Sequence, residues 1–156
     1  MRLLTERVSY HAPGWGIGEI LIDDGAVAGS LLPYPGRAAT PTRGHPVAER
    51  LVRWFAGEPD ELDDVPLAEV DETPFFADLR RALTAVRRGE VVTYGELAAL
   101  AGRPGAARAA GTFCARCDLV PFVPVHRVVG ASGLGGFGSL GLSYKRRLLE
   151  LEEWRG

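Results

Sequence analysis

The sequence predicts an α+β fold in two domains, residues 1–72 and residues 73–156. A chain of 156 residues is long enough for two small domains with cores of their own. Strand and hairpin patterns lie in the first half, whereas helical patterns fill most of the second half. The charge also divides, because residues 1–74 carry six basic and thirteen acidic side chains and residues 75–156 carry twelve and seven. This division fits a second half that meets a polyanion, and it equally fits two halves that attract each other.

The first domain is expected to begin with three strands and to continue into a helix. Arg2–Tyr10 alternates weakly, while Ile17–Ile22 and Ala26–Leu32 are clearer strands. Between them, Asp23-Asp24-Gly25 indicates a hairpin, because glycine accepts the positive φ of the turn. A loop rich in Pro and Gly leads to Pro46, which suits the first turn of a helix. Apolar residues follow it at helical spacing: Val47, Leu51, Trp54 and Phe55.

An acidic stretch, Asp60–Glu72, is expected to link the two domains, with one extended piece at Leu62–Leu67. Thr73 then suits an N-cap, and Pro74 suits the first position of the helix that follows. We expect this helix to run to Gly89. Its buried face is predicted from the spacing of four apolar residues: Phe76, Leu79, Leu83 and Val86.

Two short helices with a glycine turn between them are predicted next, at 94–101 and 106–115. A helix, a short turn and a helix in a basic region is the pattern of helix-turn-helix DNA-binding proteins. The second helix is nearly bare of bulky side chains, and Arg108 projects from it, so a DNA backbone could approach closely. The alternative is tight packing between two helices, with Arg108 as a solvated charge.

The run Val123–Val129 is predicted to be a short strand that carries a titratable group. His126 can change its charge near neutral pH, whereas Arg127 cannot. Pro124 cannot donate to a ladder, so we expect a bend or a sheet edge there. A glycine-rich loop follows, and the last helix is predicted at Ser143–Arg155, with Ser143 as its cap.

The composition excludes several classes of protein. No apolar run approaches the length of a membrane span, and the N-terminus lacks the apolar segment of a signal peptide. Two cysteines are too few for a disulfide framework, which favours a cytoplasmic location. Trp15 and Trp54 are expected in the core rather than in a ligand site.

Five motifs follow one another in the second half of the chain: Thr93-Tyr94-Gly95-Glu96-Leu97-Ala98, Ala107-Arg108-Ala109-Ala110-Gly111, Pro124-Val125-His126-Arg127-Val128-Val129, Gly133 with Gly136, and Lys145 with Leu148, Leu149 and Glu152. In order and spacing, this series resembles the O6-alkylguanine-DNA alkyltransferases over about residues 73–152, and residues 1–72 resemble the family more loosely. The resemblance implies a small N-terminal α/β domain of ribonuclease H-like type and a mainly helical C-terminal domain of winged helix-turn-helix type. It also implies a monomer that needs no cofactor and binds double-stranded DNA at an alkylated guanine.

The resemblance assigns a role to each matched residue. Tyr94 resembles the tyrosine that helps to rotate the nucleotide out of the duplex, and Arg108 resembles the arginine that fills the gap in the stack. His126 and Glu152 resemble the pair that takes the thiol proton through a water. Further positions match residues at the DNA or at the extruded guanine: Ala106, Ala107, Ala109, Gly111, Arg127, Val128 and Ser139.

The family carries its acceptor cysteine where this chain has Val125. Alkyl transfer needs a thiolate, and valine has no lone pair, so transfer to this position is excluded. Relatives without the cysteine, the alkyltransferase-like proteins, usually carry Trp there and flag alkylated DNA for excision repair. The chain therefore resembles a lesion-binding protein that does not repair. It departs further from the family at Cys117, usually Asn, and at Gly138, usually Tyr.

Other readings stay open. His126 and Glu152 could activate a water or another substrate, or they could be a buried pair kept for folding. Cys114 and Cys117 could supply a displaced acceptor, and their C-x-x-C spacing could be a redox pair or half of a zinc site. No metal site is expected, because His11 and His45 lie in the other half without ligand spacing. A homologue recruited to bind another molecule through its acidic half is the last alternative.

Overall fold

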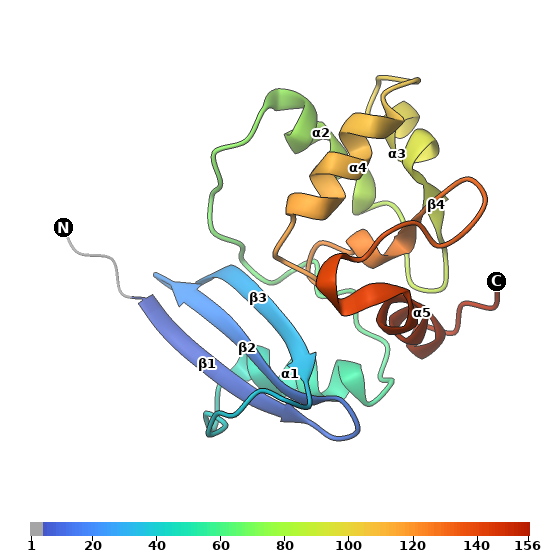
Figure 1. Cartoon of the computed structure of the whole chain (residues 1–156). Coiled ribbons are helices and arrows are strands. Elements are labelled where there is room, and N and C mark those ends of the chain that lie inside the picture. Colours follow the sequence, from blue (N-terminus) through green and yellow to red (C-terminus); the bar gives the residue numbers. More distant parts are fainter. Residues whose placement is uncertain (1–4) are drawn as a thin grey trace. The chain divides into compact units, whose positions relative to one another are not determined.

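The structure is a computed structural model that describes residues 5–156, so the start of the strand predicted at Arg2–Tyr10 lies outside the described residues. The chain divides into two compact units. The first is Met1–Val70 with Asp118–Phe122, and the second is Asp71–Cys117 with Val123–Gly156. The mixed α/β character of the prediction is confirmed, as Figure 1 shows. The domain ranges 1–72 and 73–156, and the ribonuclease H-like and winged helix-turn-helix types, stay predictions.

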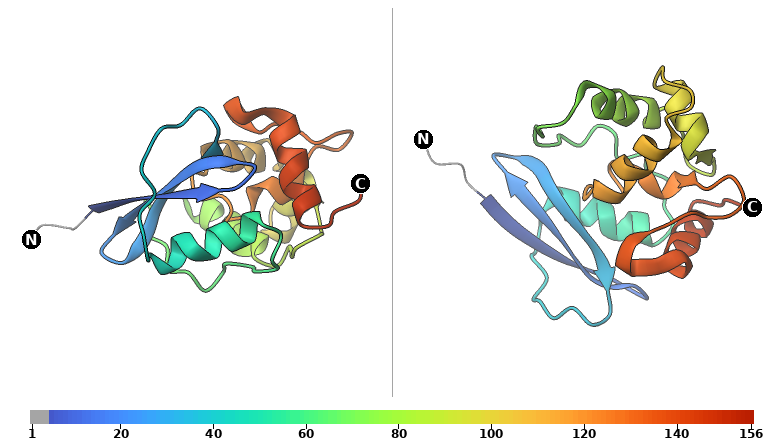
Figure 2. Two further views of the ribbon diagram at one scale, coloured as in Figure 1. Left: turned by 90° about the horizontal axis from the view of Figure 1, so that it is seen from below. Right: turned by 45° about the horizontal axis from the view of Figure 1, so that its top comes forward.

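The first unit is built on an antiparallel sheet in the order β1-β2-β3. Its strands are β1 (Thr5–Ala12), β2 (Gly16–Asp23) and β3 (Ala26–Tyr34). The predicted hairpin turn joins β2 to β3, with positive φ at both Asp24 and Gly25. Helix α1 (Pro46–Phe55) begins at the predicted proline and packs against the sheet (Figure 2).

Aromatic residues fill the core of this unit. Trp15 and Trp54 are buried, as predicted, and both rings lie edge-on against Phe55. The indole N–H of Trp15 donates to the carbonyl of Phe55 at 3.1 Å, which gives the buried polar atom a partner. The outer edge of β3 is covered by the chain itself, because the N–H of Ser30 donates to the carbonyl of Asp118 at 2.8 Å.

Helix α2 (Pro74–Leu83) opens the second unit, and the Thr73 hydroxyl caps it by accepting the N–H of Phe76 at 3.2 Å. The helix ends before the predicted Gly89. From Thr84 to Val86 each backbone N–H donates to the carbonyl three residues back, so the chain tightens into turns. Leu79, Leu83 and Val86 are buried as predicted, whereas Phe75 is buried in place of Phe76.

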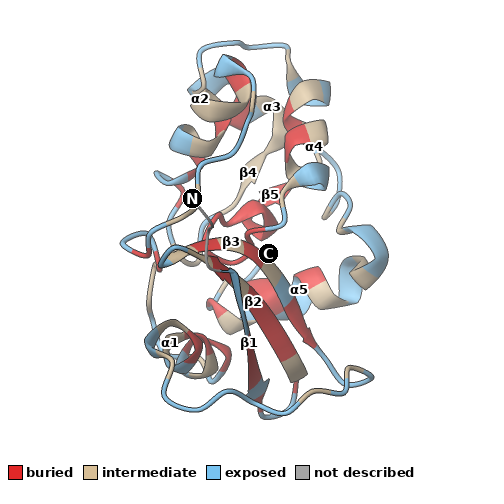
Figure 3. Ribbon diagram, turned by 90° about the vertical axis from the view of Figure 1, so that its left-hand side faces the viewer, coloured by how far each residue is buried: buried red, intermediate tan, exposed pale blue. Residues whose placement is uncertain are grey.

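Helices α3 (Tyr94–Leu100) and α4 (Ala107–Arg116) form the predicted pair. Thr93 caps α3 in a capping box: its hydroxyl accepts the N–H of Glu96, and the Glu96 carboxylate accepts the N–H of Thr93. Gly102 and Gly105 take positive φ in the turn between the helices, where a side chain would be strained. Figure 3 shows the buried sides of both helices turned toward the interior of their unit.

The prediction of a strand over Val123–Val129 is wrong for most of its length. Val125–Arg127 form one turn of 3₁₀ helix, η1, and only Val128–Val129 form a strand, β5, which pairs in parallel with β4 (Val92–Thr93). The N–H of Arg127 donates to the carbonyl of Pro124 at 3.0 Å, which closes the turn. A strand would send His126 and Arg127 to opposite faces, whereas the turn brings both to one partner.

The last helix, α5 (Gly141–Leu151), starts before the predicted cap and ends before the predicted end. A short 3₁₀ turn, η2 (Gly138–Leu140), leads into it, and Leu140 takes the cap position, so the prediction that Ser143 caps the helix is wrong. Glu152 is the C-cap, and Glu153 follows with a φ of 68°. Among residues 5–156, no helix combines the length and apolarity that a membrane crossing requires.

Candidate functional site

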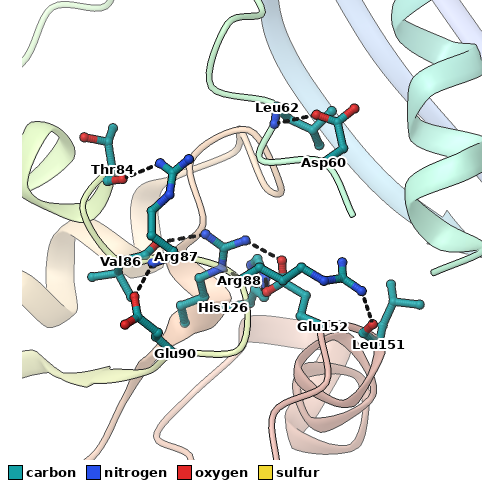
Figure 4. A network of polar contacts seen from close by, with 11 residues as sticks. Asp60, Leu62, Thr84, Val86, Arg87, Arg88, Glu90, His126, Leu151 and Glu152 are labelled. Carbon is teal, nitrogen blue, oxygen red and sulfur yellow. Dashed lines mark hydrogen bonds and ion pairs between the residues drawn. The ribbon is translucent and has the colours of Figure 1, made fainter. Parts of the chain in front are cut away.

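A buried ionic network ties three segments of the second unit together (Figure 4). The Glu152 carboxylate lies 2.7 Å from Nε2 of His126 and accepts Nε–H of Arg127 at 2.9 Å. Nη2 of Arg127 donates to the second carboxylate oxygen, and Nη1 donates to the carbonyl of Val86 at 2.8 Å. The network therefore joins the end of α5, the turn η1 and the segment after α2.

The charges in this network follow from burial and from its partners. Burial raises the pKa of Glu152, but hydrogen bonds from Arg127 and His126 outweigh it and lower the pKa to about 2. Burial lowers the pKa of His126, against the opposing effect of the Glu152 carboxylate. At neutral pH the carboxylate is therefore ionised and the imidazole is neutral. An ionised carboxylate only accepts, so Nε2 carries the ring proton and Nδ1 is the basic atom.

Val125 stands directly before this histidine and is 4 % exposed. Its N–H donates to the carbonyl of Val123 at 2.8 Å, and it begins the turn η1. The side chain holds only carbon and hydrogen. The position that the sequence predicts for the nucleophile thus holds a buried hydrocarbon side chain, one residue before a neutral imidazole.

Lys145 holds the glycine-rich loop that follows β5. This side chain is 1 % exposed, and its ammonium group donates to the carbonyls of Val128 and Leu134 at 2.6 Å each and of Gly136 at 3.1 Å. Burial lowers the pKa of Lys145 to about 8. Lys145, the sole lysine of the sequence, belongs to one of the five motifs, but sequence reasoning gave it no role.

Tyr94 packs beneath the same loop. Its hydroxyl accepts the N–H of Gly136 at 3.3 Å, and the ammonium of Lys145 lies 5.8 Å from the centre of its ring. A Cβ on Gly135 would lie 2.6 Å from this hydroxyl, and the φ of Gly135 is 82°. The loop can therefore follow this path only because that position is a glycine.

Helix α4 has one packed side and one exposed side. Ala110 is buried, Ala106, Ala109 and Gly111 are half-buried, and a Cβ on Gly111 would lie 4.0 Å from the Tyr94 ring. Ala107 and Arg108 are exposed. One side of the helix therefore packs against its own unit, as the packing alternative expects, and Arg108 lies on the exposed side. That DNA approaches this exposed side stays a prediction.

The remaining predicted residues divide between surface and interior. Ser139 lies in η2 and is exposed. Val128 is buried, and its carbonyl accepts from Lys145. Arg127, expected at the DNA, is 3 % exposed because its guanidinium binds Glu152, so it is not presented at the surface.

The two cysteines lie at the end of α4, and neither forms a disulfide. Burial raises the pKa of the Cys114 thiol to about 12, and the neighbouring Cys117 adds to this. A thiol of this kind stays protonated at neutral pH and is a poor nucleophile. No group of three or more metal-binding side chains occurs within the described part of the chain.

Comparisons with known proteins agree with this geometry. The family model described as 6-O-methylguanine DNA methyltransferase, DNA binding domain, matches residues 74–154. A methylated-DNA–protein-cysteine methyltransferase from Methanopyrus kandleri is 42 % identical over 126 residues, which are 76 % of this chain and 90 % of that protein. The enzyme of the same name from Mycobacterium bovis is 44 % identical over 110 residues, 69 % of this chain, and the match spans 64 % of that protein's length.

A solved structure extends the likeness to nearly the whole chain. The structure described as Mycobacterium tuberculosis OGT in complex with DNA has a TM-score of 0.77 and 32 % identity, and the match covers 94 % of this chain and 92 % of that one. The family model alone spans more than half of the sequence. The chain belongs to the 6-O-methylguanine DNA methyltransferase family.

Proposed function

We propose that this chain is a lesion-recognition protein: it binds double-stranded DNA, receives an O6-alkylated guanine turned out of the duplex, and leaves the alkyl group in place. One observation carries the proposal. His126 keeps its contact with Glu152, which also binds Arg127, whereas the residue before it, Val125, offers only hydrocarbon. Displacement of an alkyl group from oxygen needs a lone pair on the attacking atom, and valine has none.

The exposed side of α4 supports DNA binding. Arg108 stands on a surface of small side chains, so a duplex can approach the helix closely and the guanidinium can reach the base stack. Turning a nucleotide out costs a few kcal/mol, and a side chain that fills the gap offsets part of that cost. The match to the family's DNA-binding domain and the likeness to a relative solved with DNA support this reading.

The glycine loop supplies the proposed receiving surface for the base. Lys145 and Tyr94 fix the path of this loop from below, and Ser139 is exposed at its far end. Val128 is fully buried and its carbonyl accepts from Lys145, so Ser139 is the matched polar residue that this segment exposes to a base. Val125 supplies an apolar, lone-pair-free side chain in the interior.

A protein that binds a lesion without repairing it needs a partner that completes the repair. Because the alkyl group stays on the DNA, another activity has to remove it, and we place the chain upstream of an excision-repair protein. It acts in the cytoplasm as a monomer without a cofactor. The predicted ranges 1–72 and 73–156 serve as its domains, and the second supplies the DNA contacts.

A binding comparison tests the function. Fluorescence anisotropy is measured with a duplex that carries one O6-methylguanine and with the same duplex unmodified, at matched salt because phosphate contacts make affinity depend on it. We expect tighter binding to the lesion, and a loss of that preference in Arg108→Ala. Arg116→Ala is the matched control, since Arg116 is exposed on the last turn of the same helix. Equal affinity of the wild type for both duplexes would refute the proposal.

The enzymatic alternative rests on the retained pair of His126 and Glu152. A neutral imidazole oriented by an ionised carboxylate is a competent general base, so a water could be its substrate. Methanol released over many turnovers from O6-methylguanine DNA would establish this reading in place of the first. A methyl adduct on Cys114 or Cys117 would establish a displaced acceptor, which the raised pKa of Cys114 disfavours.

A further inference from the structure

The C-x-x-C pair at the end of α4 has no part in the proposed function. Cys114 lies in the last turn of the helix and Cys117 is its C-cap, and both side chains are half-buried. These are the two cysteines of the sequence. Cys117 is also the last residue of the second unit before the chain enters Asp118–Phe122 of the first.

The backbone brings the two residues within reach of a disulfide. In a helical turn, Cα atoms three residues apart are separated by about 5 Å. Disulfides span Cα separations of roughly 4.4–6.8 Å. The N–H of Cys117 donates both to the carbonyl of Phe113 at 3.1 Å and to the carbonyl of Cys114 at 3.4 Å. This shared bond tightens the turn toward 3₁₀ geometry, in which side chains at i and i+3 lie one above the other.

The surroundings separate the reactivity of the two thiols. Cys114 is held protonated by burial first and then by the field of Cys117, while Lys145 acts in the opposite direction. Cys117 leaves the helix in an extended conformation, with φ of −73° and ψ of 126°. Because Cys114 is held protonated, we assign the first attack on an oxidant to Cys117.

We propose that Cys114 and Cys117 form a reversible dithiol–disulfide site that small disulfides oxidise. The Cys117 thiolate attacks one sulfur of glutathione disulfide, breaks its S–S bond and releases one glutathione thiolate. The Cys114 thiolate then attacks the Cys117 sulfur and releases the second glutathione. The two cysteines lose two protons and two electrons, and two molecules of glutathione carry them away. This site does not depend on the proposed function.

The size of the closed loop makes the bond reversible. A disulfide stabilises a protein chiefly by restricting the unfolded chain, and this restriction is small when only four residues lie in the loop. A bond with little stabilisation has a higher reduction potential than a structural disulfide, so glutathione can reduce it again. The pair is therefore suited to respond to redox conditions and not to hold the fold.

The test oxidises the full chain with glutathione disulfide at several pH values and reads intact and peptide masses after an acid quench. We expect a glutathione adduct on Cys117 first, and then a peptide with Cys114 joined to Cys117 and two hydrogens fewer. The second step should accelerate about tenfold per pH unit, because the thiolate fraction of Cys114 rises in that proportion below its pKa. Added glutathione should restore the starting mass.

Two variants keep this test decisive. Cys114→Ser should stop at the adduct on Cys117, and Cys117→Ser should stay unmodified at neutral pH because its remaining thiol is protonated. The proposal fails if the wild type holds two glutathione adducts and no internal bond, or if no bond forms while a reference dithiol in the same buffer is oxidised. It also fails if Cys117→Ser reacts as fast as the wild type.

Discussion

Replacement of Glu152 by Gln should destabilise the fold by about 3 kcal/mol at pH 7. The carboxylate accepts bonds from both His126 and Arg127 in a buried site, and its pKa is lowered from 4.5 to about 2. A lowering of this size corresponds to about 3 kcal/mol of folding free energy at neutral pH. The range of 3–5 kcal/mol typical of a broken buried ion pair agrees with it, because Arg127 would keep its charge and lose its counter-ion.

The stabilisation that Glu152 contributes should depend on pH and weaken in acid. The folded pKa of Glu152 lies below its unfolded value, so the stabilisation is fully present above about pH 4.5 and disappears as the pH falls toward 2. The difference in unfolding free energy between wild type and Glu152→Gln should therefore shrink over that window. Other carboxylates titrate there too, and the difference between the two proteins removes their contribution.

Urea unfolding followed by circular dichroism, repeated from pH 7 to pH 2.5, measures this difference. Glu150→Gln is the matched control, since Glu150 is exposed on the same helix and should change stability by no more than about 0.5 kcal/mol. The reasoning is wrong if the two variants are equally stable at pH 7. It is also wrong if the cost of Glu152→Gln stays constant down to the lowest pH.

Three further predictions concern the glycine loop and a helix cap. Gly135→Ala should abolish the preference for the lesion, because its Cβ would meet the Tyr94 hydroxyl at 2.6 Å, whereas Gly133→Ala, with open space around it, should bind normally; anisotropy separates the two. Raising the pH through about 8 should speed amide hydrogen exchange in the loop by more than the increase that unprotected amides show, because a neutral Lys145 can donate to only two of its three carbonyls. Exchange rates that rise with pH only as those of unprotected amides do would contradict this. Thr93→Ala should lose about 1 kcal/mol of stability by removing the cap of α3, which thermal unfolding would show, and an unchanged midpoint would contradict it.

Much of the fold could be predicted because its signals are local. The turn at Asp24 and Gly25, the proline that begins α1 and the cap at Thr73 each depend on residues next to one another in the chain. The family's motifs could be recognised for the same reason, since their order and spacing survive in the sequence itself. The glycine turn between α3 and α4 belongs to this group.

The rest depends on contacts between distant residues. Val123–Val129 has the composition of a strand, yet the chain turns at Val125, and His126 and Arg127 share the carboxylate of Glu152, 26 and 25 residues further along. The partners of Lys145 are backbone carbonyls, which every residue has, so the sequence could not show which of them it binds. The start of α5 at Gly141 could not be predicted, because Ser143 is a favourable N-cap residue and yet lies inside the helix.

The most direct test of lesion binding without transfer is native mass spectrometry of the wild type with two duplexes of distinguishable mass, one carrying O6-methylguanine and one unmodified. Our account predicts that the complex with the methylated duplex predominates and that protein and DNA both keep their masses. A parallel sample of Val125→Cys should instead move one methyl group from DNA to protein. Equal amounts of the two wild-type complexes, or a methyl group found on the wild-type protein, would contradict the account.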